Sequence, residues 1–194
     1  DGGTLVATFF SGIVEEHDLV ITGGYPGRLR DIFGVWVEEI DALPVGERNG
    51  FSWRGKQYPA ELLCDIMHPE SAECEAEYEK DFYAGTPVIV HNRLGKGNAW
   101  YVGTRSNAEF YRDFLREVTR EAGIEEIWTP RDGVEVCVRE KDKEKFYFFL
   151  NHRQEAVEMT MEKSGCSLLE KKAYAAGEKA VLAGKGVMIF RVVM

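Results

Sequence analysis

Residues 106–123 read SNAEFYRDFLREVTREAG and have the pattern of an amphipathic helix. Ser106 and Glu109 have the spacing of a capping box, in which each side chain hydrogen-bonds an amide that the helix leaves unpaired. Apolar residues at 110, 114 and 118 lie on one stripe and predict packing against a core. Gly123 suits the left-handed position that ends a helix. The sequence therefore predicts a helix from Asn107 to Ala122.

The sequence changes character after this helix, because no later segment has a comparable helical period. Apolar and polar residues alternate at residues 134–139 and 156–161, and residues 146–150 and 187–193 are further strand-like runs, so four short strands are predicted. Turns are expected at residues 141–144, 151–154 and 183–186. Several short strands at such intervals are typical of a small antiparallel β-sandwich. We therefore predict two domains, residues 1–129 and residues 130–194, divided near Pro130.

The residues before the helix combine strand-like and helix-like patterns, which favour an α/β domain. Residues 5–10 predict a buried strand, and residues 29–33 have helical spacing followed by an extended run. Arg54-Gly55 predicts one hairpin turn, and residues 92–97 predict another between strands at 87–91 and 99–103. Residues 60–67 fit either a strand or a helical turn.

Composition excludes several classes of partner. The formal net charge of −9 and the lack of clustered Lys and Arg argue against nucleic acid. No run of 18 apolar residues is present, so no membrane span is expected. No signal peptide pattern is visible, and the protein is expected in the cytoplasm. The four cysteines, without a Cys-x-x-Cys pair, are expected to be reduced thiols.

Two local patterns are candidates for a metal site or a catalytic triad. Cys64, His68 and Cys74 do not have the spacing of a paired-ligand zinc site, so no metal is predicted. His68-Pro69-Glu70 is similar to the His-Pro-Glu stretch of class I glutamine amidotransferases, whose triad also needs an activated cysteine on a strained strand-to-helix turn. Cys64 is four residues away and has no flanking glycine. We therefore predict no catalytic, cofactor-binding or metal-binding residue.

A resemblance covers nearly the whole chain in order. Residues 2–16, 23–31 and 34–41 resemble the later half of the middle domain of family 42 β-galactosidases. Residues 81–87, 92–97 and 100–104 continue this similarity. Leu150-Asn151-His152 resembles the start of a turn in the family's C-terminal β domain.

The resemblance implies a fold, an activity and a partner. The family's enzymes have a catalytic (β/α)8 barrel, then an amidotransferase-like (flavodoxin-like) α/β domain used for trimerisation, then a small antiparallel β domain. Two barrel glutamates perform their retaining mechanism. The barrel would precede residue 1, and the α/β domain would be truncated at its N-terminus. The chain is thus expected to be a non-catalytic assembly region of an enzyme that hydrolyses terminal β-D-galactosides. It would need no cofactor and would form a homo-oligomer, expected to be a trimer in the full-length enzyme. It would meet its β-galactoside substrate only through the barrel.

Exposed apolar and aromatic side chains are what such an interface requires. The candidates are Tyr25, Leu29, Phe33 and Trp36, near the glycine-rich turn, and the alternative is that they belong to the core. Two other functions stay open. One is a carbohydrate-binding or regulatory module with Trp53 or Trp100 as its platform. The other is a degenerate amidotransferase-like domain that would need Cys64 as a nucleophile.

Overall fold

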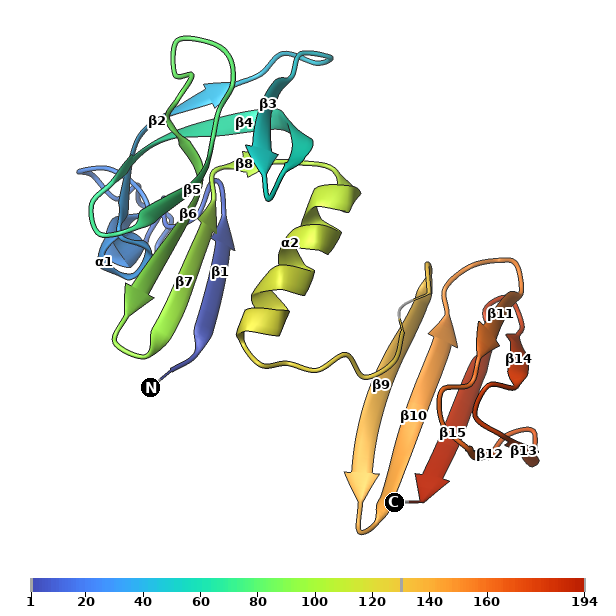
Figure 1. Cartoon of the computed structure of the whole chain (residues 1–194). Helices are drawn as coiled ribbons and strands as arrows, with labels where there is room; N and C mark the ends of the chain where they lie inside the picture. Colours follow the sequence, from blue (N-terminus) through green and yellow to red (C-terminus); the bar gives the residue numbers. More distant parts are fainter. Residues whose placement is uncertain (1, 130, 194) are drawn as a thin grey trace. The chain divides into compact units, whose positions relative to one another are not determined.

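The computed structural model describes residues 2–129 and 131–193, and the chain divides into two compact units (Figure 1). Unit 1 is Asp1–Ile124 and unit 2 is Glu125–Met194. Pro130, where the sequence predicts the division, lies outside the described residues. The chain is mostly β, with a mixed sheet in unit 1 and antiparallel pairing in unit 2. To that extent the predicted fold class is confirmed.

Unit 1 contains a mixed four-stranded sheet. In spatial order its strands are β1 (Thr4–Thr8), β7 (Gly97–Val102), β6 (Pro87–Leu94) and β5 (Glu73–Glu77). β1 is parallel to β7, whereas the other neighbours are antiparallel. The predicted β6–β7 hairpin is confirmed. The prediction of a buried strand at residues 5–10 is wrong in extent and burial, because β1 ends at Thr8 and lies at one end of the sheet, where Leu5 is exposed.

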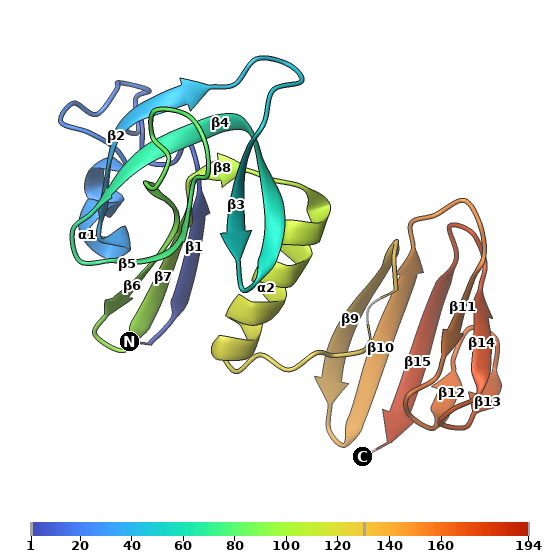
Figure 2. The same cartoon turned by 45° about the horizontal axis from the view of Figure 1, so that its top comes forward.

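A second sheet of unit 1 lies above the first in Figure 2 and is antiparallel. Its strands are β2 (Val35–Ala42), β4 (Lys56–Pro69) and β3 (Asn49–Trp53), and β8 (Thr104–Arg105) also pairs with β4. The hairpin predicted around Arg54-Gly55 joins β3 to β4. Residues 60–67, which fitted either a strand or a helical turn, are part of β4.

Helices cover both faces of the mixed sheet (Figure 1). They are η1 (Gly27–Leu29), α1 (Arg30–Phe33) and α2 (Ala108–Glu121). Alternate residues of a strand point to opposite faces. On β7, Tyr101 therefore contacts Phe33 of α1, and Trp100 contacts Phe114 of α2. The two faces belong to two separate core clusters.

The N-terminal cap of α2 differs by one residue from the prediction. Asn107 is the N-cap, and its side-chain oxygen accepts a hydrogen bond from the amide of Phe110 at 2.9 Å. The Ser106 hydroxyl instead donates to the carbonyl of Pro59 at 2.6 Å. Ser and Asn are both good caps, so this tertiary contact decides between them. Gly123 follows the helix with φ +70°, as predicted.

Unit 2 consists of two antiparallel sheets. The larger contains, in order, β13 (Lys172–Tyr174), β12 (Gly165–Ser167), β15 (Val187–Val193), β10 (Glu144–Asn151) and β9 (Val134–Lys141). The smaller pairs β11 (Val157–Thr160) with β14 (Lys179–Leu182). Four of these strands, β9, β10, β11 and β15, were predicted, whereas β12, β13 and β14 were not.

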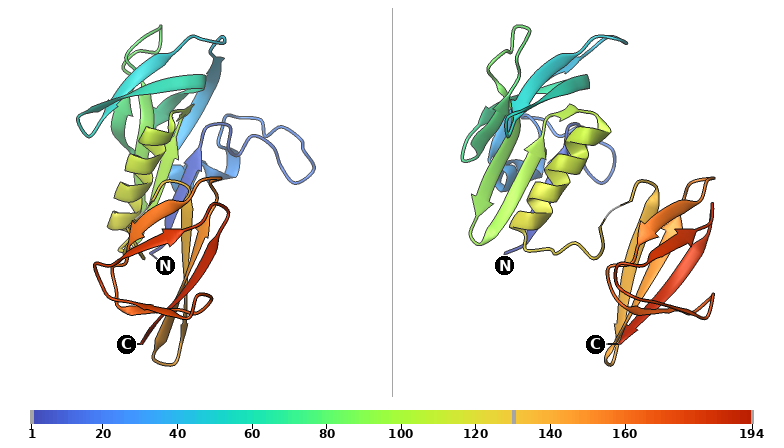
Figure 3. Two further views of the ribbon diagram at one scale, coloured as in Figure 1. Left: turned by 90° about the vertical axis from the view of Figure 1, so that its right-hand side faces the viewer. Right: turned by 45° about the vertical axis from the view of Figure 1, so that its right-hand side comes forward.

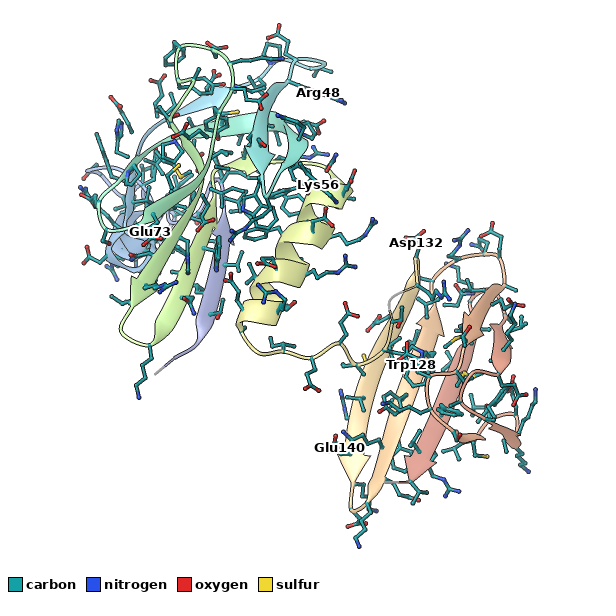
Figure 4. The ribbon with its side chains drawn as sticks, viewed as in Figure 1. Arg48, Lys56, Glu73, Trp128, Asp132 and Glu140 are labelled. Atoms are coloured by element: carbon teal, nitrogen blue, oxygen red, sulfur yellow. The ribbon has the colours of Figure 1, made fainter. Side chains whose placement is uncertain are left out.

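The core of unit 2 draws side chains from both sheets. Phe149 and Phe190 come from the larger sheet, and Met159 and Leu182 come from the smaller one. Trp128, which is labelled in Figure 4, packs edge-on against Phe149 at a centroid distance of 5.0 Å. Unit 2 therefore includes the segment just before Pro130.

Asn151 organises the turn after β10, and its loss is expected to destabilise unit 2. The buried side-chain amide donates to the carbonyls of Glu155, Leu182 and Ala183, and its oxygen accepts from the amide of Arg153. Asn151→Ala leaves these buried groups unpaired and should cost about 1–3 kcal/mol in urea unfolding. The control is His152→Ala, because His152 makes only an exposed pair with Glu135. Equal stability of the two variants would contradict this role.

Candidate self-association surface

A short hairpin projects from unit 1 between β1 and η1 (Figure 3, left). We call residues 13–21 the arm. Its two sides pair through the amide of Glu15 with the carbonyl of Leu19 at 2.9 Å, and through the amide of Ile21 with the carbonyl of Ile13 at 2.8 Å. Asp18, with φ +61°, forms the tip. The arm is therefore an ordered element although it contains no strand of regular length.

The arm exposes apolar side chains that the rest of the chain leaves uncovered. The exposed fractions are 45% for Val14, 64% for Leu19 and 59% for Val20. Phe10, just before the arm, is 62% exposed. Clusters of exposed apolar side chains mark contact sites more often than single ones do. The acidic residues Glu15, Glu16 and Asp18 lie at and beside the tip of the arm.

The base of the arm is held by a close backbone approach. A Cβ atom on Gly12 would lie 2.2 Å from the carbonyl oxygen of Pro26, so no larger residue fits there without displacing the backbone. Phe10 has φ +64°, which is unusual for a bulky residue. This geometry turns the chain out of β1 and leaves the Phe10 side chain in solvent.

A buried carboxyl group lies beneath this turn. Asp65 of β4 is 1% exposed, and its Oδ2 accepts a hydrogen bond from the Tyr101 hydroxyl at 2.7 Å. Its Oδ1 has no partner among the described residues. Burial raises the pKa of Asp65 to about 7, and the nearby Tyr101 hydroxyl and Phe10 amide only partly oppose this effect. The protonated acid is therefore the favoured form below neutral pH.

Leu29 lines a hollow at the base of the arm. The hollow has a volume of about 270 Å³ and lies between the arm and residues 26–29, with Val14, Ile21, Pro26 and Leu29 as its apolar lining. Glu15, Glu16 and Arg28 form its polar rim. Of the four residues predicted for the interface, Leu29 is the one that the structure places beside the arm's hollow.

Trp36 lies on β2, Tyr25 lies against this strand, and both are half-buried. Tyr25 bridges to Val37 through two backbone hydrogen bonds. The Trp36 ring stacks on His68 at a centroid distance of 5.0 Å, with the Arg30 guanidinium 5.8 Å from its centroid. A Cβ atom on Gly24 would lie 1.8 Å from the indole nitrogen, so only glycine fits against this ring. Both side chains keep an accessible part.

Phe33 is fully buried. It packs edge-on against Tyr101 at 5.4 Å, in the cluster that also contains Val35 and Met67. Phe33 therefore belongs to the core in this structure, which is the alternative that the sequence left open for it.

The sequence patterns did not predict the arm, and they predict Phe10 as part of a buried strand at residues 5–10. A signal was present, because Ser11-Gly12 and Gly23-Gly24 bracket a short segment with an acidic centre, which is typical of a projecting turn.

The residues weighed for chemistry lie in separate environments. Cys64 is buried and contacts the Thr104 hydroxyl, His68 pairs with Glu38 at 2.7 Å, and Cys74 points to the carbonyl of Ala76. Within residues 2–129 and 131–193, no group of three or more His, Cys, Asp or Glu side chains could hold a metal. Burial raises the pKa of the Cys64 thiol, which disfavours a nucleophilic thiolate.

The two tryptophans considered as a sugar platform are core residues. Trp53 is 3% exposed and Trp100 is 1% exposed. A stacking platform needs an open ring face, so the structure contradicts this basis for a carbohydrate-binding module. In the described part of the chain, no helix is long and apolar enough to cross a bilayer.

These features define a two-domain, mostly β protein with a projecting apolar arm. Residues 1–125 match the family model described as the β-galactosidase trimerisation domain, and residues 133–191 match the β-galactosidase C-terminal domain. The chain therefore belongs to the family 42 β-galactosidases and comprises these two domains.

Known relatives are similar in sequence and structure to nearly the whole chain. β-Galactosidase BgaA of Planococcus sp. (strain 'SOS Orange') is 44% identical over 195 residues, which cover 97% of this chain and 29% of the relative. The crystal structure of β-galactosidase from Bacillus circulans sp. alkalophilus matches with a TM-score of 0.87 and 40% identity over 98% of this chain and 29% of that one. Gan42B, a family 42 β-galactosidase from G. stearothermophilus, matches with a TM-score of 0.86 and 32% identity, over 100% of this chain and 28% of its own. The chain thus spans less than a third of the length of each.

Proposed function

We propose that this chain is the assembly region of a longer β-galactosidase and does not itself cleave galactosides. The observation that carries the proposal is the succession of a trimerisation-domain match and a C-terminal-domain match along the chain. The longer enzyme would hydrolyse terminal β-D-galactosides, and the partner of this region would be further copies of itself, in a trimer. The exposed apolar arm supports this role, because association is driven largely by burial of apolar surface.

We also propose that unit 1 is the later part of an amidotransferase-like, flavodoxin-like α/β domain. Parallel pairing of β1 with β7, and helices on both faces of the mixed sheet, support this finer assignment. β1 stands at the end of the described sheet, so a further parallel strand could continue the sheet there. In this assignment the domain keeps the scaffold of an amidotransferase, while Cys64 is a core thiol.

A β-galactosidase assay tests the catalytic half of the proposal. The purified chain is expected to show no turnover of a chromogenic β-galactoside above the buffer rate. BgaA of Planococcus, assayed in parallel, is the positive control. Turnover that copurifies with the chain through two chromatographic steps would contradict the non-catalytic role.

A further inference from the structure

The larger sheet of unit 2 has a second apolar face, on the side away from the core of that unit. Tyr147 and Phe149 of β10 belong to the core, and so do Met188 and Phe190 of β15. Because alternate residues of a strand point to opposite faces, the residues between and beside these four point away from the core. We call the apolar ones among them the outer face: Phe146, Phe148, Leu150, Val187 and Ile189.

The pairing of β10 with β15 brings the side chains of the outer face together. Phe148 lies opposite Ile189, and Leu150 lies opposite Val187. Side chains directly opposite each other on neighbouring antiparallel strands are close enough to interact. Val187 is 48% exposed and the other members are half-buried. The described part of the chain therefore leaves a continuous apolar surface open to solvent.

The composition of β10 and β15 indicates that something covers the outer face. Residues 146–150 read FYFFL, and residues 187–190 read VMIF. A strand covered on both faces is a near-continuous apolar run, whereas a strand with one face in water alternates apolar and polar residues. The neighbouring strand β9 alternates, with Glu135, Cys137 and Arg139 on its outer side. β10 and β15 thus have the composition of strands that are buried on both faces.

A further domain of the same enzyme is the occupant that these features favour. The chain spans less than a third of the length of its relatives, so most of such an enzyme lies outside it. A second copy is less suitable, because the trimerisation-domain match ends at residue 125, before β10 and β15. A sugar is less suitable too, because the five side chains of the outer face have no hydrogen-bonding group to meet its hydroxyls.

We infer that the outer face of unit 2 packs against the catalytic domain of the longer enzyme, with Phe148 and Ile189 at the centre of the contact. Arg139 and Arg191, which lie opposite Phe146 on either side, form its polar rim. The inference rests on the proposed function and deepens it. Unit 1 carries the self-association, whereas unit 2 fixes the catalytic domain to the assembly region.

The thiol of Cys137 reports on this contact, because Cys137 lies opposite Phe148 in the pairing of β9 with β10. Its rate of labelling by iodoacetamide, read by peptide mass spectrometry, is compared between the 194-residue chain and the longer enzyme that contains it. Labelling should be at least about tenfold slower in the longer enzyme, because it then requires the contact to open; tenfold corresponds to about 1.4 kcal/mol. Val181→Cys is the control thiol. Val181 is 58% exposed on β14, in the smaller sheet, so its cysteine should react equally in both proteins.

A matched pair of substitutions tests whether the outer face itself makes the contact. Val187→Asp in the longer enzyme places a charge in the contact and should return Cys137 labelling to the rate seen in the 194-residue chain. Val181→Asp makes the same change on the smaller sheet and should leave the labelling slow. Circular dichroism and β-galactoside turnover of each variant show that it is folded.

The outcomes separate this inference from the proposed function. A longer enzyme that cleaves β-galactosides but labels Cys137 as fast as the 194-residue chain would overturn the inference alone. Equal protection of Cys137 and of the Val181→Cys thiol would also overturn it. Labelling of the 194-residue chain that slows as its concentration rises would assign the outer face to a second copy instead. A longer enzyme without β-galactoside turnover would contradict the proposed function, and with it a catalytic domain as the partner.

Discussion

Replacing Phe110 with alanine is expected to lower the unfolding free energy of unit 1 by about 3–5 kcal/mol, as large-to-small changes at buried aromatic positions do. Phe110 is fully buried and lies where α2 meets the β3–β4 hairpin. Its ring packs edge-on against Phe51 at 5.1 Å and Tyr58 at 5.2 Å, and stacks on Phe114 at 5.4 Å. Alanine would leave a cavity that these large rings fill only partly.

Calorimetric unfolding separates this effect from any effect on unit 2. The core of unit 2 is a separate cluster, so its transition should not move when Phe110 is replaced. Glu109→Ala on the same helix is the control, because this side chain is exposed and its ion pair with Lys56 is long, at 4.0 Å; Figure 4 labels Lys56 near the start of α2. A Phe110→Ala loss as small as that of the control would contradict the assigned core.

The stability of unit 1 is expected to fall as pH rises from about 4 to about 7, through Asp65. The pKa of this carboxyl group is about 7 in the folded chain, against an ordinary value of 3.8 for Asp. The folded state therefore binds the proton more tightly than the unfolded state. The stabilisation is complete below about pH 4 and is lost as pH rises through the folded pKa. The difference corresponds to about 4 kcal/mol.

Asp65→Asn is the variant that isolates this effect. The amide has the shape of the protonated acid and can still accept the hydrogen bond from Tyr101, but it cannot ionise. Its unfolding free energy, measured in urea at several pH values, should lose most of the decline between pH 4 and pH 7. The neighbouring Cys64 and Tyr101 have pKa values raised above 9 and 10, so they do not titrate in this range. Equal slopes for the variant and the wild type would contradict the buried acid's role.

Sequence patterns predicted the elements whose structure depends on residues close together in the chain. The hairpins at Arg54-Gly55 and at residues 92–97, and the helix with its stripe at 110, 114 and 118, all follow from turn residues and periodicity. The exact cap did not follow, because Ser106 and Asn107 have similar propensity and a contact with Pro59 decides between them. β12 and β13 were missed because three residues give too little alternation to count, and β14 was missed because Lys179-Ala180-Val181-Leu182 does not alternate.

The sequence predicted the region of the candidate surface but not the residues that form it. The glycine-rich turn drew attention to Tyr25, Leu29, Phe33 and Trp36, but the sequence could not distinguish a helical residue that faces the sheet from one that faces solvent. Phe33 is a helical residue that faces the sheet, and it lies in the core. The exposure of Leu19 and Val20 depends on Gly12 approaching Pro26 and on the turn above Asp65. These are contacts between distant segments, which no local pattern reports.

The central claim is that this chain is a self-associating region of a family 42 β-galactosidase. Native mass spectrometry of the purified wild-type chain tests it most directly. The account predicts a dominant species of three chains, with smaller species appearing on dilution. A single-chain mass at every concentration would contradict the claim.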